Sequence, residues 1–548
     1  MTSFSQLPLE IQLQVLDRLV KDKRCLTARD RQNLCAPMRV NSFWFHHVAD
    51  ILWNTVSSLE TMFKHMGLED DRRQIYVSKI RILNLHSARI YFDLIEDLKF
   101  DSLTHLTLRG DHMGILPFLQ PNLKAIRLVS GFDLTSHELN QMNELCPNLC
   151  ELQIIPARPP NCRRGGIVRH NPDPIDCNHV LSFLSRSRSL KSLTIGSQLP
   201  NPLVSAALTG LLPLVADQLE ELVLSNVEPF ALPPNLQEIL EACTCLRKFE
   251  HRRTVRGSTV SMGIILRGLA TTTNLEHLRL DHPIVEDDVG DCIKRHDAPF
   301  SNLQSLGLKG GALPVSRFLS LSLESLTRLQ LVVDDQNHQI CSSISRLRTL
   351  TYLNLVIGIN HQGWFNDGVR FKPEPHDWEA TPDDMQALTT LRRLKSLSIR
   401  PMNINLTAPW LTHDYFNTWT TKFSHLQDLE LDIECPLSFS SIVTLSKIHP
   451  LLRRCKLLWI QEIEDWINLP PTHFTNLQQL KLNVVTHANA DCIRMHLLAL
   501  FNLKARYLSL SPLKVNFGAA DPYRRPGRAE DEPGVKTLDA SAGDFDDD

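Results

Sequence analysis

Basic side chains recur at corresponding places of two consecutive leucine-rich segments. Lys248 and Arg252 occupy the third and seventh places of the segment that starts LRKFEH, and His277 and Arg279 occupy the third and fifth places of LEHLRL. Alternate side chains of a strand share one face, and paired strands lie about 4.8 Å apart, so these groups would converge on neighbouring strands. Such a cluster could bind an acidic or phosphorylated peptide. The alternative is a solvated surface with scattered charge.

Acidic side chains alternate in another segment, where Asp428, Glu430 and Asp432 would face the same side of a strand. Carboxylates in this arrangement could bind a metal ion. The next segment, however, places Arg454 and Lys456 opposite the first two acids. Cross-strand ion pairing explains the acids more simply than a metal does.

Catalytic motifs are absent from the sequence, which has no HExxH, GxxxxGK[ST], GxSxG or GxGxxG. Cys162, His170, Cys177 and His179 lie close together in the chain, but their spacings fit no zinc pattern. We therefore expect a chain that is not an enzyme and that binds no metal and no cofactor.

These residues lie within a repeat of aliphatic side chains at the first, fourth and sixth places of a short segment. Examples are LTHLTL from Leu103, LTRLQL from Leu326 and LQDLEL from Leu426. Sixteen copies begin between Ile80 and Ala505, about 28 residues apart on average. The fourth and sixth residues of a strand would enter a core, and the third, fifth and seventh would face outward.

The segments that connect the copies have helical spacing of apolar residues, as in 235–243 and 260–269. Over residues 80–518 the chain resembles the leucine-rich-repeat family. The resemblance implies an α/β solenoid of about sixteen repeats with parallel strands on the concave side and helices outside. An ordinary α/β domain with leucine-rich strands is the alternative, but it would need a motif such as GxGxxG and would not repeat.

Two intervals between copies are long, which predicts loop insertions near 156–178 and 358–382. The second contains Trp364, Phe365, Phe371 and Trp378 among glycines and prolines. Two interpretations stay open, packing of these aromatics on the solenoid and contact with a substrate. The predicted substrate-binding set is therefore Lys248, Arg252, His277, Arg279, Trp364 and Trp378.

The N-terminal residues form a second pattern. Leu7 and Pro8 begin a helix signal, because proline suits a first helical turn. Apolar residues follow with helical spacing, and a second apolar segment ends in Leu52-Trp53. Together they are Leu7, Pro8, Ile11, Val15, Leu16, Leu19, Val40, Trp44, Leu52 and Trp53. About fifty residues cannot bury all of them, so part of this surface needs a partner.

The order of these ten residues along the chain, and their spacing along the helices, resemble the F-box motif. The resemblance implies a three-helix F-box at 1–56, followed by a helical linker at 57–79. It also implies docking onto the Skp-family adaptor of an SCF-type ubiquitin ligase with its cullin–RING core, while the repeats bind a protein substrate. The alternatives are an N-terminal cap for the solenoid, as such arrays require, and an interaction scaffold unconnected to ubiquitin.

Composition limits the remaining possibilities. The 58 Lys and Arg nearly balance the 61 Asp and Glu, so a net charge of -3 predicts no nucleic acid and no membrane partner. No apolar run approaches the roughly 18–20 residues that span a bilayer, and the start lacks a signal-peptide pattern. With 13 cysteines and no C-x-x-C pair, we expect free thiols and a cytoplasmic or nuclear protein. Residues 519–548 have the composition of a disordered acidic tail.

Overall fold

The structure is a computed structural model of the chain. It describes residues 11, 14, 32–34, 37–39, 42–59, 62–63, 70–85, 95, 97–109, 114–129, 136–155, 183, 186–187, 189–196, 208–210, 215–225, 227, 232–233, 235–252, 262–295, 298–335, 339–358, 377–402, 404–462, 476, 479–484 and 514–519. The chain divides into two compact units, residues 1–246 and 247–548, and each is described on its own.

In the first unit, strands β1 to β7 pair in chain order, and every pair is parallel. Its described elements are η2 (Pro37–Arg39), α3 (Ser42–Leu52), β1 (Thr55–Val56), α5 (Asp70–Val77), β2 (Ile82–Leu85), β3 (His105–Arg109), η4 (Leu116–Phe118), β4 (Ala125–Val129), α6 (Ser136–Leu145), β5 (Glu151–Ile155), β6 (Ser192–Gly196), β7 (Glu221–Ser225) and α9 (Leu236–Ala242).

The second unit has a longer parallel sheet in the order β8, β9, β10, β11, β12, β14, β16, β18, β19, β20. The elements are β8 (Lys248–Arg252), α10 (Gly263–Ala270), β9 (His277–Ile284), α11 (Glu286–Arg295), β10 (Ser305–Gly310), α12 (Ala312–Leu319), β11 (Arg328–Val333), α13 (Gln339–Ile344), β12 (Tyr352–Ile357), β13 (Asp377–Glu379), α14 (Pro382–Leu388), β14 (Ser396–Pro401), β15 (Asn405–Thr407), α15 (His413–Thr420), β16 (Asp428–Leu431), β17 (Leu437–Ser438), α16 (Phe439–Ile448), β18 (Arg454–Glu462), β19 (Gln479–Val484) and β20 (Lys514–Ala519).

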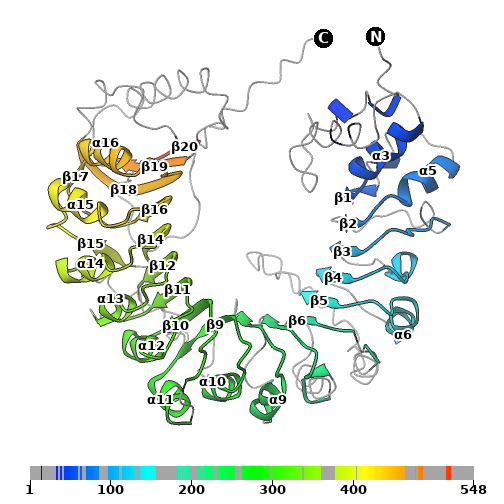
Figure 1. The fold of residues 1–548 in the computed structure, drawn as a ribbon, viewed down its shortest axis with the longest axis horizontal. Helices are drawn as coiled ribbons and strands as arrows, with labels where there is room; N and C mark the ends of the chain where they lie inside the picture. Colours follow the sequence, from blue (N-terminus) through cyan, green and yellow to red (C-terminus); the bar gives the residue numbers. More distant parts are fainter. Residues whose placement is uncertain are drawn as a thin grey trace, which may run out of the picture. The chain divides into compact units, whose positions relative to one another are not determined.

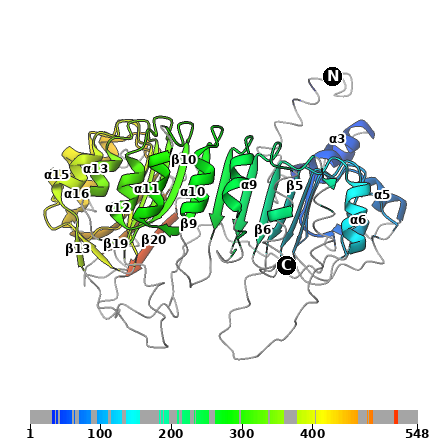
Figure 2. The ribbon, with the colours of Figure 1, turned by 90° about the horizontal axis from the view of Figure 1, so that it is seen from below.

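Within this second unit the helices α10 to α16 lie along one side of the sheet (Figures 1 and 2). We call the opposite side of the sheet the strand face. Fifteen of the sixteen predicted copies contain a parallel strand. The predicted α/β class with a long parallel sheet is therefore confirmed, and it is consistent with a leucine-rich-repeat solenoid. The sixteenth copy, at Ala505, lies outside the described residues.

Leucines at the fourth and sixth places form the core, as the sequence predicts. Leu306 and Leu308 of β10 are buried, whereas the neighbouring odd-numbered places remain partly exposed. The register aligns equal places of successive strands, so Leu306 pairs with Leu329 and Leu329 with Leu353. Burial of each leucine stabilises the stack of strands by about 1.5–3 kcal/mol.

Asparagines that precede the first leucine of a repeat connect neighbouring repeats. Asn122, Asn148, Asn302 and Asn476 each donate from Nδ2 to a backbone carbonyl of the preceding repeat, at distances of 2.6–2.9 Å. Each bond satisfies a carbonyl at the entrance to the sheet. The aliphatic pattern alone does not predict this contact.

The sheet begins earlier than residue 80. Strand β1 lies at Thr55–Val56, inside the segment predicted as F-box, and pairs with β2. Helix α5 follows within the predicted helical linker at 57–79. The two-residue strand β1 is too short to show the aliphatic pattern, which explains why the sequence places the start of the sheet at Ile80.

The predicted insertions and tail are described only in part. Residues 156–178 and 359–376 lie outside the described residues. The end of the second predicted insertion is ordered structure, because β13 pairs in parallel with β15 and α14 begins at Pro382. Strand β20 ends at Ala519, the first residue of the predicted tail, and 520–548 are outside the described residues.

Candidate functional site

The four predicted basic residues are brought together on the strand face of the second unit. Lys248 pairs in register with His277, and Glu250 with Arg279, on the neighbouring strands β8 and β9. Glu250 lies between the cations: Lys248 Nζ is 3.6 Å from its Oε1, and the Arg252 guanidinium donates to its Oε2. The convergence that the sequence predicts is present, with an acid at its centre.

Arg279 is engaged in the same way, because its Nε and Nη2 donate to the two carboxylate oxygens of Asp281 at 2.9 and 3.3 Å. Burial alone would raise the pKa of Glu250, but Arg252, Lys248 and Arg279 outweigh it, and that pKa lies below its usual value. The cluster therefore contains its own counter-ions. The sequence prediction of the basic cluster did not include Glu250 and Asp281, although both alternate with the basic residues on their strands.

Of the two tryptophans in the predicted substrate-binding set, only Trp378 is among the described residues. Trp378 lies on β13 and is only 5% exposed, so its side chain packs in the interior instead of extending from a loop. Of the two interpretations left open for this aromatic segment, the burial of Trp378 agrees with packing on the solenoid. Trp364 lies outside the described residues.

The described residues of the F-box-like pattern differ in burial: some lie in a small core, and one is exposed. Trp44 and Leu52 of α3 are buried against Leu34 and Val48. Partly buried neighbours, including Trp53, pack around this cluster. Trp44 and Leu52 are therefore core residues of the module and not part of an open surface.

Ile11, in contrast, is 41% exposed. The other predicted adaptor-binding residues lie outside the described residues. They are Leu7, Pro8, Val15, Leu16, Leu19 and Val40.

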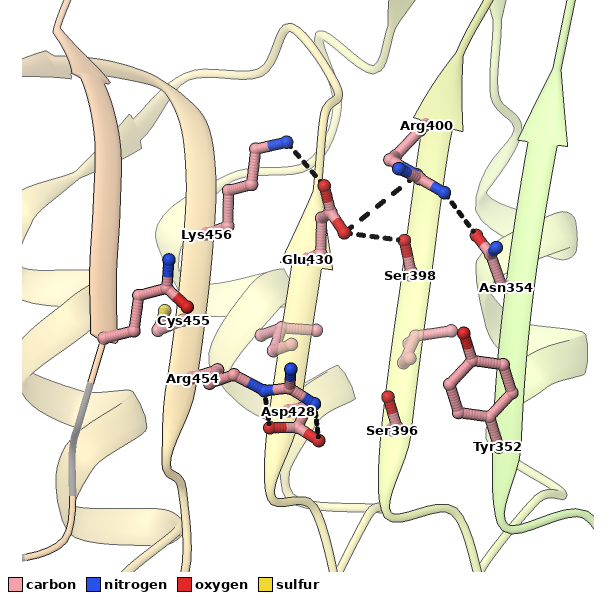
Figure 3. Close-up of a pocket in the computed structure, with 13 residues that line it drawn as sticks. Tyr352, Asn354, Ser396, Ser398, Arg400, Asp428, Glu430, Arg454, Cys455 and Lys456 are labelled. Atoms are coloured by element: carbon pink, nitrogen blue, oxygen red, sulfur yellow. Dashed lines mark hydrogen bonds and ion pairs between the residues drawn. The ribbon is translucent and has the colours of Figure 1, made fainter. Parts of the chain in front are cut away.

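A polar groove of about 350 Å³ lies further along the strand face of the second unit, on β12, β14, β16, β18 and β19 (Figure 3). This volume is within the roughly 300–1,000 Å³ of typical ligand sites. Its floor is made by residues at the third, fifth and seventh places of the repeats, which the alternation of the strands directs to this side. Sequence reasoning predicted these orientations but did not single out the groove.

Ion pairs cross the groove from strand to strand. Arg454 on β18 donates from Nε and Nη2 to the two oxygens of Asp428 on β16, at 2.6 and 2.8 Å. Lys456 donates to Oε1 of Glu430. The predicted pairing of these acids with the next strand is confirmed.

Two more strands extend this network (Figure 3). The Ser398 hydroxyl donates to Oε2 of Glu430 at 3.0 Å, and Nε of Arg400 lies 4.0 Å from the same oxygen. Nη2 of Arg400 donates to Oδ1 of Asn354 at 3.1 Å. Burial would raise the pKa of Glu430, but Lys456, Ser398 and Arg400 together lower it, so this carboxylate is ionised at neutral pH.

An aromatic ring borders the groove. Tyr352 lines it from β12, and the guanidinium carbon of Arg328 on β11 lies 5.0 Å from the ring centroid. This cation–π contact fixes the ring beside the polar floor. Among the described residues, no cluster of His, Cys, Asp or Glu could bind a metal ion. No helix in that part of the chain is long and apolar enough to span a membrane.

Comparison with known proteins shows distant similarity only. No protein-family model matches the chain, and no curated protein matches it. An internalin from Listeria monocytogenes aligns over 82% of this chain and 98% of its own length, with 13% identity and a TM-score of 0.32. A chain of the Toll–Spatzle complex from Drosophila aligns over 78% of this chain and 58% of its own length, with 12% identity and a TM-score of 0.35.

Proposed function

We propose that this protein is the substrate-recognition subunit of an SCF-type cullin–RING ubiquitin ligase. The N-terminal helices bind the Skp-family adaptor, and the repeats bind a protein substrate. The chain itself is not an enzyme, and ubiquitin transfer belongs to other subunits of the complex. We place this complex in the cytoplasm or the nucleus, with neither nucleic acid nor membrane as a partner.

The exposure of Ile11 is the main support for this proposal. Ile11 belongs to the leucine-proline start of the F-box-like pattern, while Trp44 and Leu52 of the same pattern are buried in a small core. Among the described residues, the pattern thus has members that build the module and one, Ile11, that is exposed. Burying an isoleucine side chain at an interface would contribute about 1.5–3 kcal/mol.

The repeats support a receptor role. Their parallel sheet leaves a strand face on which polar side chains from different repeats lie at regular spacing. Such a face can contact an extended segment of another protein over several repeats. The groove on β12 to β19 is one such region on this face of the second unit.

Capture of the full-length chain by purified Skp-family adaptor tests the proposal. We expect wild type to be captured and Ile11→Asp to be lost, since a carboxylate cannot be buried there without a partner. Ile75→Asp is the matched control, because Ile75 on α5 is 40% exposed but lies outside the F-box-like pattern. Equal capture of wild type and Ile11→Asp, or equal loss with Ile75→Asp, would contradict the proposal.

A scaffold unconnected to ubiquitin is the second candidate, and one observation favours it. The N-terminal helix α3 packs against α5, the helix that precedes β2: Tyr76 of α5 lies against Phe45 and Trp53, with ring centroids 6.0 and 5.6 Å apart. Helices in this position would cap the array. Failure of the wild-type chain to bind any Skp-family adaptor would select this function.

A further inference from the structure

The groove on β12 to β19 has hydrogen-bond donors that have no partner among the described residues. Each carboxylate oxygen of Asp428 and Glu430 already accepts one bond. Arg454 uses two of its three nitrogens, and Lys456 bonds only to Glu430 among the described residues. Because these cations have more donors than their partners use, the groove suits a ligand rich in acceptors.

Further donors surround these two cations. Asn354 uses its carbonyl oxygen to accept from Arg400, which leaves its amide NH₂ as a donor. The hydroxyl groups of Tyr352 and Ser396 also line the groove. The Arg454 side chain is 61% exposed and the Arg400 side chain 40%, so a ligand can reach both.

Charge supports the same ligand class. The lining contains the cations Arg400, Arg454 and Lys456 and the anions Asp428 and Glu430, which leaves one positive charge in excess. The basic positions continue along the sheet, where Lys481 of β19 pairs in register with Lys456, and Lys514 of β20 with Gln479. The backbone register therefore places basic residues on successive strands.

We propose that this groove binds an extended acidic segment of a protein substrate, with glutamate or aspartate carboxylates bound by Arg400, Arg454 and Lys456. This inference rests on the proposed receptor function for its biological role. The distance from β14 to β20 is four strand spacings, roughly 19 Å, which about six extended residues would span. The segment crosses the strands instead of running along one of them.

Carboxylates fit the groove better than a phosphoryl group does. A phosphoserine carries a charge of about -1.5 to -2 at neutral pH. The lining has a single excess positive charge, because Asp428 and Glu430 compensate two of the three cations. One carboxylate balances that excess, whereas a phosphoryl group would exceed it and would compete with both resident acids.

Fluorescence anisotropy with the full-length protein tests the inference. The probe is a short labelled peptide of alternating glutamate and serine, compared with the same peptide containing glutamine and with one containing a single phosphoserine among glutamines. We expect the glutamate peptide to bind most tightly and to lose affinity as salt is added. Binding of the phosphoserine peptide alone would overturn the choice of carboxylate.

The double variant Arg400→Gln with Lys456→Gln should weaken binding of the glutamate peptide by about tenfold. Arg317→Gln is the matched control, because Arg317 lies on helix α12 and donates to Glu286, away from the strand face. The double variant Lys248→Gln with Arg279→Gln tests the basic cluster on β8 and β9. Loss of binding in this second double variant, with normal binding in the first, would overturn the inference.

A gain of affinity gives a test that unfolding cannot imitate. Asp428→Asn removes the carboxylate that engages two nitrogens of Arg454, so Arg454 becomes available to the peptide. We expect affinity for the glutamate peptide to rise about threefold. Unchanged or weaker binding by correctly folded Asp428→Asn would contradict the assignment of Arg454.

Adaptor capture on the same preparations distinguishes the two proposals. Groove variants should still be captured by the adaptor, because none of their residues lies near the N-terminal helices in the sequence. If the adaptor does not bind wild type but the glutamate peptide does, the ligase role fails and the groove assignment stands. If the adaptor binds and the glutamate peptide does not, the groove assignment fails alone.

Discussion

Gly358, at the end of β12, lies so close to the backbone of Met402 that a Cβ on the glycine would be 1.9 Å from the Met402 carbonyl oxygen. The strands approach here because Met402 N–H donates to the carbonyl of Ile357 at 2.7 Å. Only a residue without a side chain fits this contact. The glycine thus allows β12 and β14 to stay paired up to the point where the second predicted insertion, 358–382, begins.

Gly358→Ala should therefore destabilise the second unit by about 1–3 kcal/mol, because backbone atoms must move. Urea unfolding monitored by circular dichroism measures this change. Gly290→Ala is the control: Gly290 lies within helix α11, and its Cβ would be 3.8 Å from the nearest side-chain atom. The control should be neutral or more stable, since alanine favours a helix. Equal stability of Gly358→Ala and wild type would contradict the contact.

Asp288 connects two helices. Its buried carboxylate accepts from the backbone N–H of Met262 and Gly263 at the start of α10, and from that of Val285 before α11. Asp288→Ala leaves these donors without the carboxylate, and we expect a loss of about 1–3 kcal/mol in the free energy of unfolding. The neighbouring exposed Asp287 provides the control, and Asp287→Ala should change stability by less than about 0.5 kcal/mol. Similar losses in both variants would exclude this role.

Much of this structure can be predicted from the spacing of aliphatic residues in the sequence. The aliphatic places predict which side of each strand is buried, and with the side fixed, Asp428 and Arg454 fall opposite one another. The local pattern does not predict the structure around Trp378, because the short pairing of β13 with β15 depends on contacts between residues that are distant in the sequence. The local pattern does not predict the groove either, because the groove is formed by side chains from five strands.

His449 makes the stability of the second unit depend on pH. Its side chain is buried, and burial lowers its pKa, although a hydrogen bond with the backbone of Thr420 acts in the opposite direction. The unfolded chain therefore takes up a proton near pH 6.5, while the folded chain takes it up only at lower pH. The contribution of neutral His449 to stability is full above about pH 6.5 and is lost progressively as the pH falls toward the folded-state pKa.

The melting temperature at pH 7.5 and at pH 5.5 measures this effect. We expect wild type to lose more stability between the two conditions than His449→Gln does, because glutamine takes up no proton. Other groups contribute equally to both proteins and cancel in the comparison. An identical pH dependence of the two proteins would contradict a role for His449.

Trp378 provides the last prediction, because its burial on β13 separates packing from substrate contact. Trp378→Ala removes a large side chain that is 5% exposed, and we expect a loss of about 3–5 kcal/mol in the free energy of unfolding. Trp378→Phe keeps most of the volume and should lose less. At a temperature where both variants remain folded, binding of the glutamate peptide should equal that of wild type, since Trp378 does not line the groove. A variant that keeps full stability but no longer binds the peptide would instead place Trp378 in the binding site.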